Sequence, residues 1–193
     1  MTAAQSLGTF FVLPAIIALL GGYMICREEQ DDTLKSLKLI PINEIRLTCA
    51  KMLVALLFSI TIYLLLFVIT ILTEFILHFE QFNFEVIFRF LKMYFLNGLC
   101  MFLAISPIIA LVTLIKKSYW LALVFAEIYS FSALFIGILG DVGAFHPVIA
   151  SFNITGYYSA TPKQMIISIA SLLICAVLAY SLLFTAQKKK TSY

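Results

Sequence analysis

Charged residues are scarce in this sequence. They make up 12% of its 193 residues, whereas hydrophobic residues make up 63% and the mean hydropathy is +1.06. A soluble domain carries about a quarter charged residues, so the composition excludes an ordinary soluble protein. The sequence instead predicts an integral membrane protein with a single membrane domain over residues 1–193.

Motifs for catalysis and for metal binding are also missing. The four cysteines form no CxxC pair, and the only histidines are His78 and His146. The chain has no HExxH sequence, and Gly137, Gly140 and Gly143 lack the Lys-Ser/Thr that completes a phosphate-binding loop. We therefore expect no enzyme activity, no metal or cofactor site and no nucleic-acid partner. Any work against a gradient must draw its energy from another protein.

The sequence does contain long hydrophobic runs. A membrane-spanning helix needs about 20 apolar residues, and five runs reach that length. Because a chain in lipid must satisfy its backbone hydrogen bonds internally, and the runs show no period of two, they predict helices and not a barrel. The fold class is therefore all-α. The predicted spans are Leu7–Cys26, Met52–Thr73, Met93–Ile115, Tyr119–Leu139 and Met165–Ala186.

The positions of the basic residues predict the orientation. Ten of them lie in residues 27–51, 116–118 and 187–193, against three in residues 74–92 and 140–164. Basic residues favour the cytoplasmic side of a membrane. We therefore expect the N-terminus, including an outer tail of six residues, to lie outside and the C-terminus to lie in the cytoplasm.

The predicted outer loop, residues 140–163, has an unusual composition. Its middle, Phe145–Ile154, is mostly apolar. Irregular backbone at membrane depth is tolerated where protein shields it. This loop therefore predicts a segment that re-enters the outer leaflet.

Polar, proline and small residues within the spans suggest further contacts. Pro14 and Pro107 are each expected to kink a span, and Ser106 to satisfy backbone that Pro107 leaves free. Small residues at four-residue spacing allow helices to approach closely in lipid. The two predicted packing stripes are Ala18, Gly22 and Cys26, and Ser171, Cys175 and Ala179.

Glu127 is the only charged residue inside a predicted span. An acid at that depth costs about 2.5–3.5 kcal/mol on insertion scales, so it must face protein or water. Asn97, Ser130 and Ser132 are possible hydrogen-bond partners. Two interpretations stay open: Glu127 lies with Asn97 on a substrate pathway, or it makes a hydrogen bond between helices.

Residues Arg27–Lys51 form a polar interval between two charge-free runs, with five basic and five acidic residues. Residue types that cap helices precede Leu34 and Leu37, which share one helical face, and Pro41 ends this segment. The pattern predicts a helical elbow at the membrane surface. It either docks a soluble motor protein or only fixes the topology, and docking is preferred because a plainer loop would fix the topology equally well.

The stretch from Ile25 to Leu53 resembles the first cytoplasmic loop of type-2 ATP-binding-cassette export permeases, in particular those of bacitracin-export and lantibiotic-immunity systems. That loop typically shows an acid-rich run, Gly-Thr-Leu, two leucines, Pro-Ile or Pro-Val, and a Lys that opens the next span. Asp32 stands where the family commonly has Gly. The matching residues are Glu28, Thr33, Leu34, Leu37, Pro41, Ile42 and Lys51.

The resemblance implies six spans, both chain ends in the cytoplasm and a re-entrant segment, here Phe145–Gly156, before the last span. With five spans, this sequence looks like the family without its first helix. The resemblance also implies that the polar interval holds a coupling helix seated in a groove of an ATPase subunit. The residues expected to dock are Glu28, Asp31, Thr33, Leu34, Lys35, Leu37, Lys38 and Pro41.

These expectations combine into one function and two alternatives. The chain is expected to be the permease subunit of an exporter in the bacterial cytoplasmic membrane, surrounded by lipid and paired with a second copy or a related permease. A separate ATPase would drive it, and it would expel a peptide or hydrophobic antibiotic. One alternative is a non-transporting membrane anchor or assembly partner. The other, a secondary transporter, is weaker because the sequence shows no inverted repeat.

Overall fold

The structure is a computed structural model that describes residues 2–30, 44–77, 84–115 and 119–191. Its regular elements within these ranges are all helical. They are α1 (Thr2–Leu7), η1 (Gly8–Val12), α2 (Leu13–Gln30), α4 (Glu44–Leu77), α5 (Phe84–Ile115), α6 (Trp120–Ile136), η3 (Gly137–Phe145), α7 (Pro147–Thr155) and α8 (Pro162–Thr191).

Five helical segments are long and apolar enough to cross a membrane, which confirms the predicted fold class. Several of them extend beyond the predicted spans, because a helix continues into the polar residues that flank an apolar run. At 1.5 Å per residue, the 34 residues of α4 extend about 50 Å, more than the roughly 30 Å of hydrocarbon. The five segments are Ala4–Arg27, Arg46–Leu77, Phe84–Val112, Trp120–Phe145 and Pro162–Ala186.

The first apolar segment begins at Ala4, three residues before the predicted span. The residues predicted as an outer tail are helical from Thr2 onward, and Gln5 is fully buried. The helix continues there because α1 packs against η1 and α4. Gln5 therefore belongs to the interior of the bundle.

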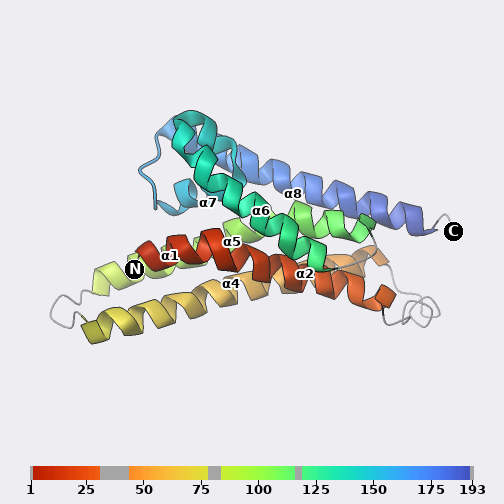
Figure 1. The fold of residues 1–193 in the computed structure, drawn as a ribbon, viewed down its shortest axis with the longest axis horizontal. Helices are drawn as coiled ribbons and strands as arrows, with labels where there is room; N and C mark the ends of the chain where they lie inside the picture. The colour runs from red at the N-terminus through yellow and green to blue at the C-terminus, as the bar shows by residue number, and fades with distance from the viewer. Residues whose placement is uncertain (1, 31–43, 78–83, 116–118, 192–193) are drawn as a thin grey trace.

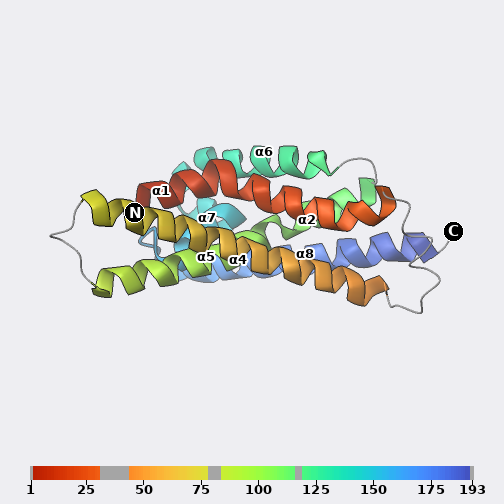
Figure 2. The same cartoon turned by 90° about the horizontal axis from the view of Figure 1, so that it is seen from below.

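The helices form an elongated bundle with α5 at its centre (Figure 1). α5 packs against α4, α8, α7 and α2, while α6 packs mainly on α2. Figure 2 shows the same bundle turned by 90°, with α2 and α6 running side by side. Fully buried side chains such as Tyr63, Tyr94, Met101, Ile105 and Phe152 fill the core between these helices.

Small residues let the helices approach closely. A Cβ at Gly98 of α5 would lie 2.9 Å from the Cα of Ile60 in α4, so only glycine fits there. Ser59 Oγ of α4 donates a hydrogen bond to the Gly98 carbonyl at 2.7 Å, which fixes the register of the two helices. Both predicted packing stripes are buried, as expected for seams between helices.

The segment after α6 folds back as a helical hairpin. η3 passes through Gly140, whose φ of +59° favours glycine, and the chain then reverses into α7. His146 caps the N-terminus of α7, and Gly156 ends it with a φ of +77°. The side chains of α7 are almost all buried against α5 and α8. The structure thus confirms a segment shielded by protein in the predicted outer loop.

Candidate functional site

The first span contains a π-helical turn beside a proline. The Leu13 N–H donates to the Gly8 carbonyl, five residues back, which widens the helix over Gly8–Val12. In that register the next donor is residue 14, but Pro14 has no N–H. The Thr9 carbonyl is thus left without its backbone donor. Ser130 Oγ of α6 donates to it at 3.3 Å, so a side chain from another helix replaces the missing hydrogen bond.

The Thr9 side chain is the centre of a buried polar network. Its hydroxyl oxygen accepts a hydrogen bond from the Tyr63 hydroxyl at 3.0 Å and another from Asn97 Nδ2 at 3.1 Å. All of these side chains are fully buried, and with Ser130 they come from four different membrane-spanning segments. Interhelical hydrogen bonds in membrane proteins average about 0.6 kcal/mol. Each hydrogen bond of the network therefore contributes little free energy, but together they specify the relative positions of these helices.

Some polar atoms in this interior are unsatisfied. Within the described residues, Asn97 Oδ1 and both amide atoms of the Gln5 side chain are buried without a hydrogen-bond partner. Sequence reasoning found Asn97 but missed Gln5, Thr9 and Tyr63. The signal was present, because Gln5 and Thr9 are polar residues four positions apart, which places them on the same face of a helix. Buried polar groups inside membrane proteins commonly mark functional positions.

The structure separates Glu127 from the partners that the sequence suggested, which corrects that expectation. Asn97 and Ser130 bond to Thr9, and Ser132 Oγ bonds to the Tyr129 carbonyl and to His146 Nε2. The buried face of α6 is formed by Ala122, Ala126, Ser130 and Ala133. Glu127 follows Ala126 by one residue, a rotation of about 100°, so its side chain points away from that face.

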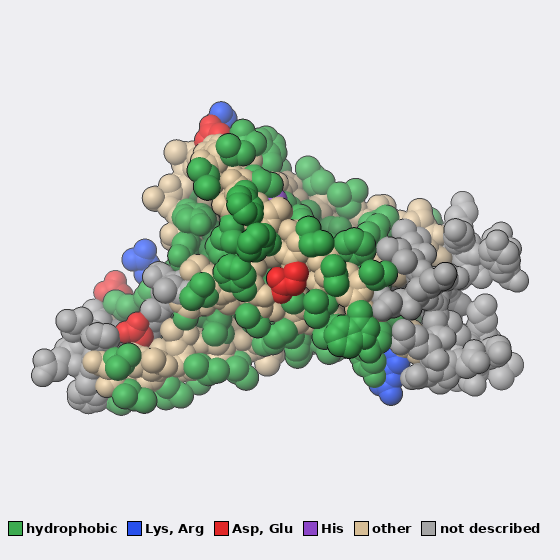
Figure 3. All heavy atoms as spheres, viewed as in Figure 1, with side chains coloured by type: hydrophobic (Ala, Val, Ile, Leu, Met, Phe, Trp, Pro, Cys, Tyr) green, Lys and Arg blue, Asp and Glu red, His purple; other side chains and the backbone are tan. Residues whose placement is uncertain are grey.

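Glu127 instead lies on the hydrophobic outer surface. It is half-buried, and it makes no hydrogen bond to any of the described residues. Its neighbours along α6, Val124, Ile128 and Phe131, are exposed. Figure 3 shows an acidic side chain in the middle of a largely hydrophobic face, and α6, which crosses that face in the same view, holds a single acidic residue. A carboxyl group in this place needs a partner from outside the described part of the chain.

Pro107 lies within α5, and Ser106 contacts the backbone that the proline leaves free. The helix runs without interruption through the proline, which cannot donate to the Leu103 carbonyl four residues back. Ser106 Oγ donates to that carbonyl at 2.8 Å. The expected repair of the backbone by Ser106 is thus confirmed.

The hairpin of η3 and α7 is fixed by polar contacts on both sides. His146 Nδ1 accepts from the Val148 N–H at 3.3 Å, and Nε2 lies 3.1 Å from Ser132 Oγ, while the ring stacks on Tyr129. Burial lowers the pKa of His146 to about 4, so the ring is neutral. Because Nδ1 accepts, Nε2 carries the proton and donates to Ser132.

Two hydrogen bonds attach the other side of the hairpin to α8. Ser171 Oγ donates to the Phe145 carbonyl at 2.8 Å, and Asn153 Nδ2 donates to Ser168 Oγ at 3.0 Å. The hairpin is therefore held between α6 and α8 by side chains of both helices.

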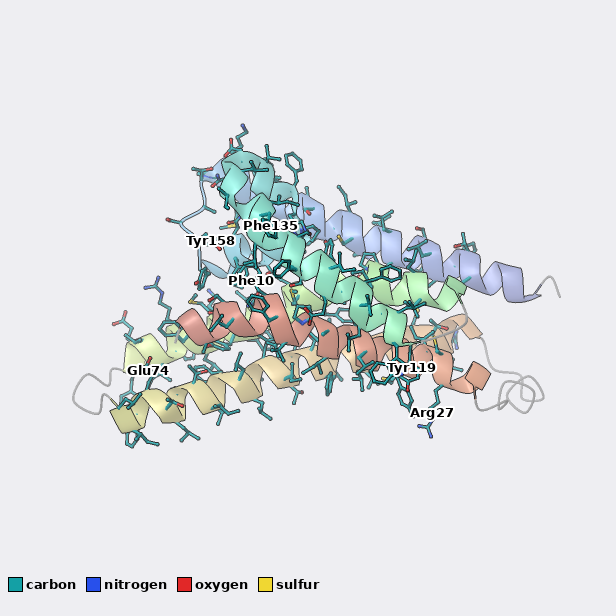
Figure 4. The ribbon with its side chains drawn as sticks, viewed as in Figure 1. Phe10, Arg27, Glu74, Tyr119, Phe135 and Tyr158 are labelled. Carbon is teal, nitrogen blue, oxygen red and sulfur yellow. The ribbon has the colours of Figure 1, made fainter. Side chains whose placement is uncertain are left out.

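Aromatic residues gather at the opposite end of the bundle. The Arg27 guanidinium lies 5.7 Å from the centre of the Tyr23 ring, and the ring of Tyr23 lies 5.5 Å from that of Tyr119. Tyr119 in turn stacks on Trp120. Figure 4 labels Arg27 and Tyr119 at this end. Tyrosine, tryptophan and long basic side chains are typical of the boundary between lipid and water.

The predicted docking loop lies mostly outside the described residues. Asp31, Thr33, Leu34, Lys35, Leu37, Lys38 and Pro41 are not described. Glu28 lies in the last turns of α2, where the backbone alone is described. The end of α2, the start of α4 and the end of α8 all lie at the same end of the molecule (Figure 1).

Comparisons with known proteins agree with these observations. The family described as "ABC-2 family transporter protein" matches residues 1–133, from α1 into α6. The bacitracin transport permease protein BCRB of Bacillus licheniformis is 31% identical over 114 residues, which are 59% of this chain and 54% of that protein. The match thus spans about half the length of this relative. No solved structure matches the chain.

The family match covers more than half of the 193 residues, including the first three apolar segments and most of α6. It agrees with the resemblance of the stretch from Ile25 to Leu53 and with the five apolar helices of a multi-pass membrane protein. The chain belongs to the ABC-2 family of transporter proteins.

Proposed function

We propose that this chain is the permease subunit of an ATP-binding-cassette exporter that expels a peptide or hydrophobic antibiotic. It acts in the bacterial cytoplasmic membrane, and a separate ATPase supplies the energy. Membership of the ABC-2 family supports a permease role, and the similarity to a bacitracin transport permease supports an antibiotic as substrate.

The observation that carries the proposal is where α2 ends and α4 begins. Both helix ends lie at the end of the bundle that α8 reaches with Lys188–Lys190, near the aromatic residues around Arg27 (Figures 1 and 4). Ten of the thirteen basic residues lie in residues 27–51, 116–118 and 187–193 of the sequence, which supports a cytoplasmic location for this end of the bundle and an outer location for the N-terminus. A cytoplasmic ATPase would meet the loop there.

Docking would rest on the apolar pair Leu34 and Leu37. The charged residues Glu28, Asp31, Lys35 and Lys38 would set the register on the ATPase, with Thr33 and Pro41 bounding the coupling helix. Binding energy at interfaces concentrates in a few buried anchors, whereas exposed ion pairs contribute about 0–1 kcal/mol each. The two leucines are therefore the residues to replace.

Glu127 would lie on the substrate pathway at a face shared with a second permease copy or a related permease. Its carboxyl group sits on a hydrophobic surface without a partner among the described residues, and a second subunit or a passing substrate would supply one. Asn97 remains the second polar position in this proposal, because its buried Oδ1 also lacks a partner in the part of the chain that the structure describes.

The test is recovery of a co-expressed ATP-binding-cassette ATPase by the full-length chain in detergent. The double variant Leu34→Ala/Leu37→Ala should recover at least tenfold less ATPase than the wild type, since two anchors of more than 1 kcal/mol each are lost. The matched control is Leu65→Ala/Leu72→Ala, which alters two exposed leucines of α4 away from the loop.

Equal recovery by both double variants and the wild type would remove the docking role. Export is measured as the resistance of cells to an antibiotic. If the chain binds the ATPase but gives cells no ATP-dependent resistance to any antibiotic, the result would instead favour a membrane anchor or assembly partner.

A further inference from the structure

A cavity lies beside the hairpin, at the end of the bundle away from the predicted docking loop. Its volume is about 420 Å³, and its walls come from η1, α6, η3, α7, α8 and the connection between α7 and α8. Protein sites for small ligands commonly have volumes of about 300–1,000 Å³, whereas one water molecule occupies about 30 Å³. The cavity is therefore of the size of a ligand site and far larger than a site for a single water.

The walls of the cavity combine aromatic and aliphatic surface with uncharged polar groups. Phe10 and Tyr158 contribute rings, and Leu134, Ile138 and Ile149 contribute aliphatic side chains. None of the residues that line it is charged. Figure 4 shows Phe10 and Tyr158 close to one another near α6 and α7. A charged ligand would lose its hydration here without compensation.

The aromatic wall is held in place from behind. The Phe152 ring, which is fully buried, lies 4.9 Å from the ring of Phe10 and 5.6 Å from that of Tyr158. Tyr157 packs edge-on against Tyr158. Rings that are fixed in this way present a flat surface to a ligand without losing further side-chain entropy.

One polar atom in the wall is free to accept a hydrogen bond. Asn153 is 6% exposed, and its Nδ2 is used by Ser168. Among the described residues, its Oδ1 receives no hydrogen bond and is not completely enclosed. Because Asn153 lines the cavity, a ligand there with an N–H donor would satisfy this oxygen.

The charged residues nearest to the cavity are already paired. Lys163 Nζ lies 3.3 Å from Asp141 Oδ2, and Gln164, which lines the cavity, donates to Asp141 Oδ1 at 2.8 Å. The Gln164 side-chain oxygen accepts from the Thr161 N–H. These contacts use the side chains of Asp141, Lys163 and Gln164 for one another, and leave Asn153 Oδ1 as a buried acceptor in the wall.

We propose that this cavity binds an uncharged aromatic group that carries an N–H donor, such as an aromatic residue within a peptide. The ring would lie against Phe10 and Tyr158, and the N–H would donate to Asn153 Oδ1. That the natural ligand is part of the exported compound rests on the proposed function. The binding itself needs no ATPase.

The test uses tryptophan fluorescence and a brominated probe. Trp120 is the only tryptophan and lies at the other end of α6. The reporter is the full chain with Leu139→Trp and Trp120→Phe, because Leu139 is an exposed residue between Ile138 and Gly140 that does not itself line the cavity. The wild type with Trp120 reports partition into the detergent micelle. The probe is N-acetyl-4-bromo-L-phenylalaninamide, whose bromine quenches a tryptophan that lies close to it. Its matched charged analogue is N-acetyl-4-bromo-L-phenylalanine.

We expect saturable quenching of the reporter by the neutral amide, with at least tenfold weaker binding of the carboxylate. Ala160→Phe, added to the reporter, fills the cavity from its rim and should abolish the saturable phase. Ala170→Phe is the matched control, because Ala170 is an exposed residue of α8 that does not line the cavity. Helical content and elution volume establish that each variant is folded.

Three results would overturn the inference. The first is linear quenching that is equal for the reporter and for Trp120, which means partition only. The second is saturable quenching that survives Ala160→Phe. The third is equal quenching by phospholipids with brominated acyl chains in nanodiscs, which makes a lipid chain the occupant. Loss of ATPase docking in the Leu34/Leu37 variant leaves all these readings unchanged, so the two proposals fail separately.

Discussion

Pro14 and Pro107 present the same problem to two membrane-spanning helices, and the molecule solves it in two ways. At Pro107 the replacement donor is Ser106, the preceding residue of the same helix. At Pro14 the helix widens into a π turn, and the donor is Ser130 on α6. The first repair is complete within α5. The second exists only while α2 and α6 are packed together, so the shape of the first span depends on its neighbour.

The largest loss of stability should come from a substitution of Thr9, whose carbonyl accepts the hydrogen bond from Ser130 on α6. Thr9→Val keeps the shape of the side chain but removes the acceptor of both Tyr63 and Asn97. Two buried donors are left unsatisfied, at about 1–3 kcal/mol each in soluble proteins and less in membranes. We expect a loss of about 2 kcal/mol in the free energy of unfolding, measured by titration with SDS in mixed micelles. A loss below that of Ser106→Ala would mean that the network contributes nothing.

A smaller effect is expected for Ser130→Ala, which leaves the Thr9 carbonyl without a donor. The loss should be about 1 kcal/mol, within the range measured for interhelical hydrogen bonds. The comparison is sharpened by repeating the substitution in a Pro14→Ala background, where residue 14 supplies an N–H. The cost of Ser130→Ala should then fall by at least half. An unchanged cost would show that Ser130 does not compensate for the proline.

The smallest effect is expected for Ser106→Ala, at about 0.5 kcal/mol, because Leu103, whose carbonyl accepts the hydrogen bond, is only half-buried. Ser181→Ala is the matched control. Ser181 Oγ also donates to a carbonyl three residues back, but Leu182 follows it in place of a proline. The control should leave the free energy of unfolding unchanged in the same titration. Equal losses for the two variants would break the link between Ser106 and Pro107.

The two prolines also show what sequence reasoning can reach. The repair at Pro107 was predicted because donor and acceptor lie within four residues of each other. The five apolar helices were predicted because length and composition determine a span. The Thr9 network was missed because its partners are 54 and 88 positions away in the sequence. Such pairs depend on which helices become neighbours, and hydrophobic periodicity does not contain that information.

The same limit explains the outcome for Glu127 and for the cavity. Glu127 was singled out as a costly residue, but Asn97 and Ser130 bond to Thr9, and Ser132 bonds to Tyr129 and His146. The cavity is formed by residues that lie between Phe10 and Gln164, on five helical elements and the connection between α7 and α8. No local pattern marks such a convergence.

The close contact at Gly98 has a mechanical consequence. Backbone meets backbone there, since even a methyl group would lie 2.9 Å from the Ile60 Cα, and Ser59 holds the register. Sliding α5 along α4 would require the two chains to separate first, whereas the pair can tilt together at little cost. We therefore expect that a displacement of the first turn of α4 moves α5 by the same amount, so that the two helices move in the membrane as a rigid pair.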